Sequence, residues 1–294
     1  MISLLIPTVA QGLLWAVMAL GVYVTFRVLD IADLTVEGSF PLGAATAASM
    51  MVAGFGPLAA LLGACVAGML AGIITGILHT KMKIPALLAG ILTMIALYSV
   101  NLRIMGKANL SLLGVDTTFK IAQSMMNLTM AQTTLVVGLV VTVLVGCFMY
   151  WFFGTQIGAA IRATGFNQQM IRAQGVDTDV TIILGLLISN ALVAVSGALV
   201  AQSNGFSDVG MGTGTIVIGL ASVIIGEVLF GTRSFKNCLI SVVLGSIVYR
   251  IVIALVLAMG MPPNDLKLFT SVLVAIALSM PLIKSKFGAR KAVR

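Results

Sequence analysis

Long apolar runs separated by polar connections occupy most of this 294-residue chain. A helix needs roughly twenty predominantly apolar residues to cross a bilayer, and by that measure the pattern predicts about nine transmembrane segments, with a range of eight to ten. They cover residues 7–26, 40–53, 58–78, 85–102, 135–153, 180–201, 216–230, 238–258 and 268–283. Segments 40–53 and 216–230 are short and begin in sequence rich in Gly, Ser and Thr, which is typical of broken or re-entrant helices. We therefore expect an all-α polytopic membrane protein.

One polar interruption in mid-chain is long. Residues 154–179 read GTQIGAAIRATGFNQQMIRAQGVDTD and lie between two apolar segments. Asn167 is a suitable N-cap for a short helix over 168–174, and Gly175 suits its C-terminal cap. Such a helix either lies on a membrane surface or docks into a partner, and we favour docking because two spans hold it at both ends. The residues predicted to make this contact are Asn167, Gln168, Gln169, Met170, Ile171, Arg172, Ala173, Gln174 and Gly175.

The composition agrees with a membrane protein and sets its orientation. Hydrophobic residues make up 60% of the chain and charged residues 9%, against about 25% charged residues in a typical soluble domain. The net charge of +8 does not require a nucleic-acid partner, because cytoplasmic loops of membrane proteins collect Lys and Arg. With the N-terminus outside, most Lys and Arg residues fall on the inner side. This topology places the insertion 154–179 and the C-terminus in the cytoplasm.

The sequence offers no recognisable catalytic or metal-binding motif. It has one histidine and three cysteines, and it contains no H-E-x-x-H motif, no Walker A loop and no Cys-x-x-Cys pair. We therefore expect no enzyme activity, no metal and no cofactor in this chain. If ATP drives the protein, ATP and Mg²⁺ bind to a separate polypeptide.

Two segments at the starts of the short spans are similar to each other. Residues 33–48 read DLTVEGSFPLGAATAA and residues 208–222 read DVGMGTGTIVIGLAS. Each has an acidic residue, then Gly, Ser or Thr, then small apolar residues. Interrupted helices in corresponding positions of two related halves mark the translocation path of many transporters. The similarity is equally compatible with the ordinary use of glycine and small polar residues in any broken helix.

Ionisable residues in or beside apolar spans are rare and point to function. Asp33 and Glu37 are four residues apart and share a face if their segment is helical. Glu227 lies near the inner end of its span and Arg250 lies inside the next span, so these two residues are predicted to form a buried charge pair. Two interpretations stay open. Either the charges fix helix packing, or the acidic residues of segment 33–48 line a path near the inner side.

Residues 158–201 resemble the coupling region of ABC-importer permeases of the branched-chain amino-acid and ribose type. That family has a G-x-x-x-R-A-x-G-x-N run, a short helix and a G-[IV]-[DN]-[TV]-D turn before a helix that ends in S-G-x-L, and this chain has each of them. Three further segments resemble family motifs in the same order: DLTVEGSF, KMKIPALLAGILTM and GTGTIVIGLASVIIGEVLFGTRS. The resemblance covers nearly the whole chain. It identifies residues 1–294 as a single transmembrane permease domain with a cytoplasmic coupling segment at 154–179.

Two departures from the sugar permeases bear on the substrate. Glu37 is inserted where those proteins read VGS, and Glu227 stands where they read LGG. Acidic residues beside a path suit an amine-bearing solute better than a neutral sugar, so the expected substrate is an amino acid. The chain is similar to the subgroup described as tryptophan/tyrosine transport permeases. The substrates are therefore expected in the order amino acids, aromatic or otherwise, then other small nitrogenous solutes, then sugars.

The resemblance also implies partners and a working cycle. The permease is expected to be a homodimer in the bacterial cytoplasmic (inner) membrane. A cytoplasmic ABC ATPase dimer binds the coupling residues 167–175, an extracytoplasmic substrate-binding protein delivers the solute, and alternating access moves it inward. The residues expected to line the path along the dimer axis are Thr35, Glu37, Ser39, Phe40, Thr93, Leu97, Thr213 and Thr215.

A stand-alone secondary transporter is the alternative. In that case Glu37 and Glu227 would serve ion coupling. Uptake would then depend on an ion gradient and would be insensitive to depletion of ATP.

Overall fold

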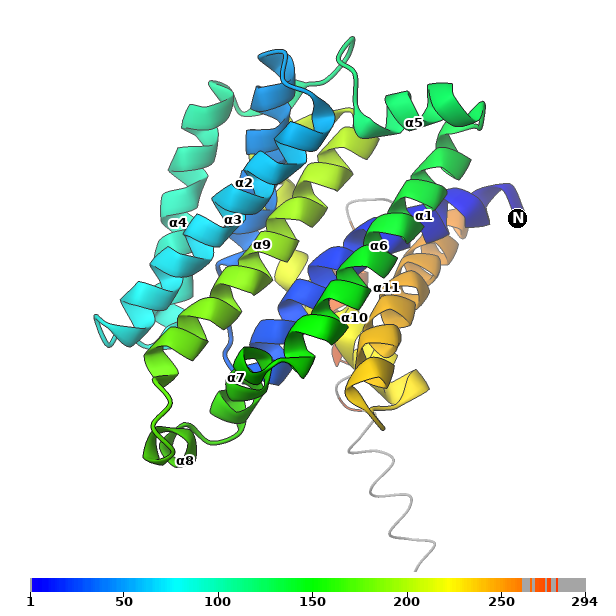
Figure 1. Ribbon diagram of the computed structural model, residues 1–294. Coiled ribbons are helices and arrows are strands. Elements are labelled where there is room, and N and C mark those ends of the chain that lie inside the picture. The colour runs from blue at the N-terminus through cyan, green and yellow to red at the C-terminus, as the bar shows by residue number, and fades with distance from the viewer. Residues whose placement is uncertain (1, 261–264, 266–267, 273, 276–278, 280–294) are drawn as a thin grey trace, which may run out of the picture.

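The computed structural model describes residues 2–260, 265, 268–272, 274–275 and 279, and nearly all of its elements are helices (Figure 1). The elements are α1 (Ile2–Tyr23), the π-helix η1 (Val24–Val28), α2 (Val36–Val52), α3 (Pro57–Thr80), α4 (Ala86–Met105), β1 (Asn109–Ser111), α5 (Thr118–Met126), α6 (Met130–Gly154), α7 (Gln156–Phe166), α8 (Gln168–Ala173), α9 (Thr178–Asn204), β2 (Phe206–Asp208), the 3₁₀ helix η2 (Val209–Gly212), α10 (Thr215–Phe230) and α11 (Phe235–Ala258). The predicted all-α class is confirmed.

Seven helical units among the described residues are long and apolar enough to cross a membrane. They are Leu5–Val28, Val209–Phe230, and helices α3, α4, α6, α9 and α11. The predicted span 40–53 is α2, whose 17 residues give a length of about 25 Å, less than the ~30 Å of a hydrocarbon core. Half of the predicted span 268–283 lies outside the described residues. Within the part of the chain that the structure describes, the expected count is therefore corrected to about seven, and span 40–53 is the prediction that fails on length.

Helix α9 lies at the centre of the bundle. It packs against α1, α2 and α3, while α11 packs against both α1 and α10. Figure 1 shows α2, α3 and α4 on one side of α9, and α1, α6, α10 and α11 on the other. Most of α9 is buried, which agrees with a sequence that is apolar on nearly every face.

Glycines at intervals of four bring α3 against the backbone of α9. A Cβ added at Gly68 would lie 2.4 Å from the carbonyl oxygen of Asn190, and one added at Gly72 would lie 2.4 Å from that of Leu186. These distances are too short for any side chain. Gly68 and Gly72 thus make a close helix–helix contact of the kind that small residues permit in membranes.

The two polar ends of the bundle have different structures. At one end, β1 and β2 form an antiparallel pair in which Asn109 lies opposite Asp208, and α5 follows β1. Helices α7 and α8 lie at the opposite end (Figure 1). Lys81 and Lys83 lie at this second end as well, because their ammonium groups are 3.6 and 4.0 Å from the carboxylate of Asp179. The basic residues near the insertion therefore gather at the end that the positive-inside rule assigns to the cytoplasm.

Side-chain caps begin several helices at these ends. The hydroxyls of Thr117, Thr155 and Ser234 each accept a hydrogen bond from the backbone N–H three residues further on, at the starts of α5, α7 and α11. Thr129 and Gln132 form a capping box at the start of α6. Because the first N–H groups of a helix have no intrahelical partner, these caps define where each helix begins.

Candidate functional site

The polar insertion folds into two short helices, α7 and α8. Asn167 lies between them in extended conformation, and its side-chain oxygen accepts a hydrogen bond from the backbone N–H of Met170 at 3.0 Å. Gly175 follows α8 with a φ of +86°, a conformation that glycine adopts without steric cost. Both predicted caps of the 168–174 helix are confirmed. The preceding helix α7 was not predicted, although Thr155 caps it in the same way.

The apolar side chains of the insertion point in two directions. Ile171 is 5% exposed, so it anchors α8 to the rest of the chain and does not offer the outward apolar contact expected of it. Phe166 is 97% exposed and Met170 is 52% exposed. We call these two exposed side chains the insertion patch. Either a partner protein or the membrane surface could cover these two side chains.

Ionic contacts tie α8 to its neighbours. The guanidinium of Arg172 donates to Asp179 at 2.7 Å and also to the hydroxyl of Thr178, both at the start of α9. The carboxylate of Asp179 additionally faces Lys81 and Lys83, in the turn between α3 and α4. This cluster connects α8 to α9 and to the α3–α4 turn.

A cavity of about 420 Å³ lies beside the insertion patch. Its lining includes Tyr23, Phe26, Arg27, Arg162, Phe166 and Phe235. The guanidinium of Arg27 lies 5.7 Å from the ring centre of Phe26, and that of Arg162 lies 5.4 Å from the ring centre of Phe235. The cavity is thus aromatic and carries two arginines and one acidic residue, Asp30, and cation–π contacts hold the arginines in place.

Glu227 does not pair with Arg250, which corrects the predicted buried charge pair. Its carboxylate accepts bonds from Nε of Arg27 at 2.8 and 3.0 Å, and the Nη2 group of the same arginine makes a further contact. The Glu227 side chain is 11% exposed and that of Arg27 is 48% exposed. A fork of this kind fixes both side chains. It joins the π-helix η1 to α10, two elements far apart in the sequence.

Arg250 instead lies over an aromatic ring. Its guanidinium carbon is 4.0 Å from the ring centre of Trp15 in α1. Among the described residues no ion pair joins Arg250 to an acidic side chain, and its buried Nε has no hydrogen-bond partner. The prediction failed because consecutive spans need not place the chosen residues at the same depth or on facing sides.

A buried polar network surrounds the start of α2. Asp33 accepts hydrogen bonds from the backbone N–H of Thr35 and from the side-chain amide of Asn190, both at 2.9 Å. Ser39 donates to the amide oxygen of Asn190 at 2.7 Å. Burial raises the pKa of Asp33 in this loop, while its hydrogen bonds act in the opposite direction. Because Asp33 precedes the helix, it does not share a helical face with Glu37.

The other predicted path residues on α2 and α4 are also buried. The hydroxyl of Thr75 lies 2.8 Å from that of Thr35 and 3.0 Å from that of Thr93. Phe40 is fully buried with its ring centre 5.0 Å from that of Trp15, and Leu97 is 6% exposed. Within the single chain these side chains face neighbouring helices. Their place on a translocation path stays a prediction.

The two similar segments, 33–48 and 208–222, meet in space. The backbone N–H of Gly214 donates to Oε1 of Glu37 at 3.0 Å, and α2 packs against both η2 and α10. Thr215 is buried and donates to the carbonyl of Gly212, whereas Thr213 is exposed. Glu37 thus stabilises the break before α10, where Gly214 has a φ of +83°.

Sequence reasoning missed three residues that organise this arrangement: Asn190, Phe166 and Arg27. Asn190 could have been found, because an amide inside an otherwise apolar span needs partners. The exposure of Phe166 and the pairing of Arg27 depend on tertiary structure, and no local sequence pattern predicts them. Among the described residues no group of His, Cys, Asp and Glu could hold a metal ion.

These observations define a multi-pass helical membrane protein with interrupted helices and an anchored, partly exposed insertion at one polar end. The chain belongs to the family described as "Branched-chain amino acid transport system / permease component", which matches residues 4–288. It is therefore the permease component of an ABC importer and not an enzyme. Membership implies a separate ATPase and a substrate-binding protein as partners, and it sets aside the stand-alone secondary transporter.

Similar proteins support this assignment. The chain is 40% identical over 275 residues to a tyrosine transport system permease protein of Clostridioides difficile (strain R20291), which covers 94% of this chain and 90% of that protein. It is 34% identical over 281 residues to the uncharacterized protein RP368 of Rickettsia prowazekii (strain Madrid E), covering 94% and 97%. A galactofuranose transporter permease protein of Escherichia coli (strain K12) is 28% identical over 184 residues, which covers 62% of this chain and 51% of that protein.

The fold is similar to that of a solved ABC transporter described as being of the metal-chelate type, in an inward-facing conformation. The match has a TM-score of 0.51 and 14% sequence identity, and it covers 96% of this chain and 85% of the other. At this identity the likeness concerns the fold alone.

Proposed function

We propose that this permease imports an aromatic amino acid, with tyrosine as the first candidate. The observation that carries the proposal is the 40% identity to a tyrosine transport system permease protein over 94% of this chain. Glu37 beside the broken helix α10 supports it, because a carboxylate near the path favours a solute that carries an ammonium group. The binding protein would supply most of the selection among amino acids.

The working unit in this proposal is a homodimer in the bacterial cytoplasmic membrane, driven by two copies of the ATPase subunit. Helix α8 and the insertion patch dock on the ATPase. The exposed Phe166 and Met170 would be covered there, and Arg162 in the adjacent cavity would meet acidic or polar groups of the ATPase surface.

A contiguous set of contacts would connect the docking surface to α10 inside the membrane. Gly165 near the end of α7 packs on the backbone of η1, since a Cβ there would lie 1.9 Å from the carbonyl oxygen of Val28. Arg27 precedes Val28 and pairs with Glu227 of α10. A displacement of α8 would therefore move α10 and the break at Gly214. The π-helical turn in this route is a form that is frequent at functional sites.

The test is uptake by the reconstituted importer. The permease, its ATPase and its binding protein are placed in proteoliposomes, and entry of radiolabelled tyrosine, tryptophan, leucine and ribose is measured with and without ATP. We expect ATP-dependent uptake of an aromatic amino acid. A variant that lacks residues 168–175 should retain the permease in the membrane and lose ATP-driven uptake. Uptake of ribose without any uptake of amino acids would refute the proposed substrate class.

A further inference from the structure

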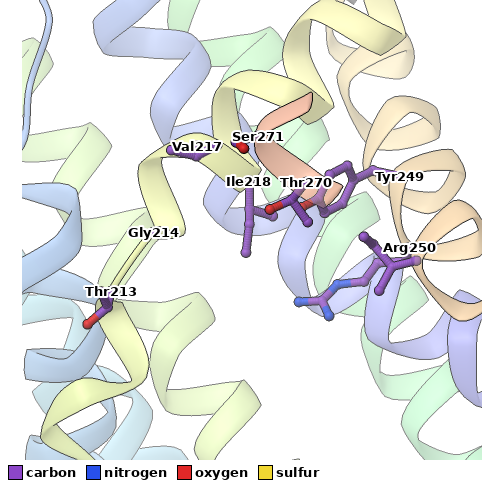
Figure 2. Close-up of a pocket in the computed structure, with 9 residues that line it drawn as sticks. Thr213, Gly214, Val217, Ile218, Tyr249, Arg250, Thr270 and Ser271 are labelled. Atoms are coloured by element: carbon purple, nitrogen blue, oxygen red, sulfur yellow. The ribbon is translucent and has the colours of Figure 1, made fainter. Parts of the chain in front are cut away.

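A second cavity lies at the break before α10, on the side that faces α11. Its volume is about 320 Å³, at the lower end of the ~300–1,000 Å³ that small-molecule sites occupy. Its lining includes Thr213, Gly214, Val217, Ile218, Tyr249 and Arg250. Thr270 and Ser271 close it on a third side, and Figure 2 shows the side chain of Arg250 extending away from α11.

The depth of Arg250 makes its charge costly unless a ligand or water meets it. Fifteen residues separate it from Phe235 at the start of α11 and eight separate it from Ala258 at the end. These separations correspond to about 22 Å and about 12 Å along the helix axis, so the residue lies well inside the hydrocarbon layer. An ionisable residue at such a depth normally pairs with an acid or faces a polar cavity.

None of the described acidic side chains pairs with the guanidinium of Arg250. Within the described part of the chain, which includes all nine Asp and Glu residues, no ion pair involves Arg250. Its Nε is buried without a hydrogen-bond partner, although the face of the guanidinium lies over Trp15. Stacking occupies the face of the group and leaves the N–H donors in its plane for another acceptor.

We propose that Arg250 binds the carboxylate of the transported amino acid at a site inside the membrane, an inference that rests on the proposed function above. A guanidinium and a carboxylate match in a two-bond fork. Val217, Ile218 and Tyr249 form an apolar wall that suits a hydrophobic side chain. At the far end of the cavity, Gly214 contacts the carboxylate of Glu37, which places negative charge on the side where the ammonium group of the ligand would lie.

The experiment uses the complete importer in proteoliposomes. Four permease variants are compared with the wild type: Arg250→Met, which removes the charge; Arg250→Lys, which keeps it; Trp15→Leu, which removes the stacking partner; and Arg103→Met, which removes an exposed charge at the end of α4. Two quantities are measured for each. One is the uptake of radiolabelled tyrosine, and the other is the ATP hydrolysis that the loaded binding protein stimulates.

Loss of the carboxylate contact should lower uptake and leave ATP hydrolysis by the ATPase largely unchanged. We expect Arg250→Met to reduce tyrosine uptake roughly tenfold or more, as the loss of a hydrogen-bonded charge contact does, with stimulated ATP hydrolysis within about twofold of wild type. Arg250→Lys should recover a substantial part of the uptake, and Arg103→Met should match wild type. Uptake by Arg250→Met within twofold of wild type would overturn the inference. So would an equal loss of uptake in Trp15→Leu, because Arg250 would then act through packing.

A binding measurement on the wild type does not depend on how the variants fold. Tyramine is tyrosine without its carboxylate. In equilibrium binding of radiolabelled tyrosine to the permease–ATPase complex, tyramine should compete at least tenfold less well than unlabelled tyrosine. Equal competition would refute carboxylate recognition. If the wild-type importer takes up no amino acid at all, the proposed function itself fails. If it takes up tyrosine and Arg250→Met does so equally, only this inference fails.

Discussion

Replacement of Phe166 by Ala tests which surface meets the ATPase. The side chain is 97% exposed in the single chain, so it should contribute little to the folding free energy of the permease. If the ATPase covers it, it should contribute much more to the free energy of ATPase binding. Full burial of a Phe side chain is worth about 1.5–3 kcal/mol. Its loss from the interface should therefore weaken ATPase binding by about 10- to 150-fold. The free energy of unfolding of the permease should change by less than about 0.5 kcal/mol.

The assay measures the dissociation constant of the purified ATPase for the permease in lipid nanodiscs, by biolayer interferometry. The matched control is Leu113→Ala, because Leu113 is 87% exposed in the segment between β1 and α5, at the opposite end of the bundle. That change should leave ATPase affinity unaltered. Wild-type affinity in Phe166→Ala would refute the docking surface. A large drop in melting temperature would refute the claim that Phe166 contributes little to the fold.

Three further changes test the interior contacts. A double-mutant cycle with Arg27→Met and Glu227→Gln should give a coupling energy of about 1–3 kcal/mol in denaturant unfolding, and a value near zero would show that the fork contributes nothing. Gly72→Ala should lower the melting temperature, because its Cβ would lie 2.4 Å from a carbonyl oxygen of α9 and overpacking costs about 1–3 kcal/mol. Gly146→Ala is the control, because an added Cβ at Gly146 would have no other atom within 4 Å, and it should leave the melting temperature unchanged or raise it. Equal melting temperatures for the two glycine variants would contradict the close contact. Asn190→Leu should destabilise the protein by about 2–4 kcal/mol, since it leaves buried polar groups without partners, and unchanged thermal unfolding would contradict the network.

Local features of this fold were readable from the sequence. The caps of α8 follow from the chemistry of Asn167 and Gly175, which act on their own backbone neighbours. The spacing of Gly68, Gly72 and Gly76 at intervals of four places them on one face of α3, a pattern that is typical of a close helix contact. Neither inference requires knowledge of which helix packs against which.

Features that depend on long-range packing were not readable. Glu227 was assigned to Arg250 because their spans are consecutive, whereas the structure pairs it with Arg27 in the first span. Ile171 and Phe166 are both apolar members of one short insertion, yet one is buried and the other is exposed. The short helix α2 was counted as a span from its hydrophobicity alone. Its 17 residues are too few to cross the bilayer, and most of its apolar side chains are buried against other helices of the bundle.

The most direct test of the central claim is copurification of the tagged chain from its native membrane in mild detergent, with mass spectrometry of the bound proteins. An ABC importer permease should bring down a soluble ATPase in about equal molar amount, and replacement of both Phe166 and Met170 by Ala should reduce that recovery. A substrate-binding protein recovered alongside would then identify the ligand. Reproducible recovery of the chain alone, from gently solubilised membranes, would contradict the account.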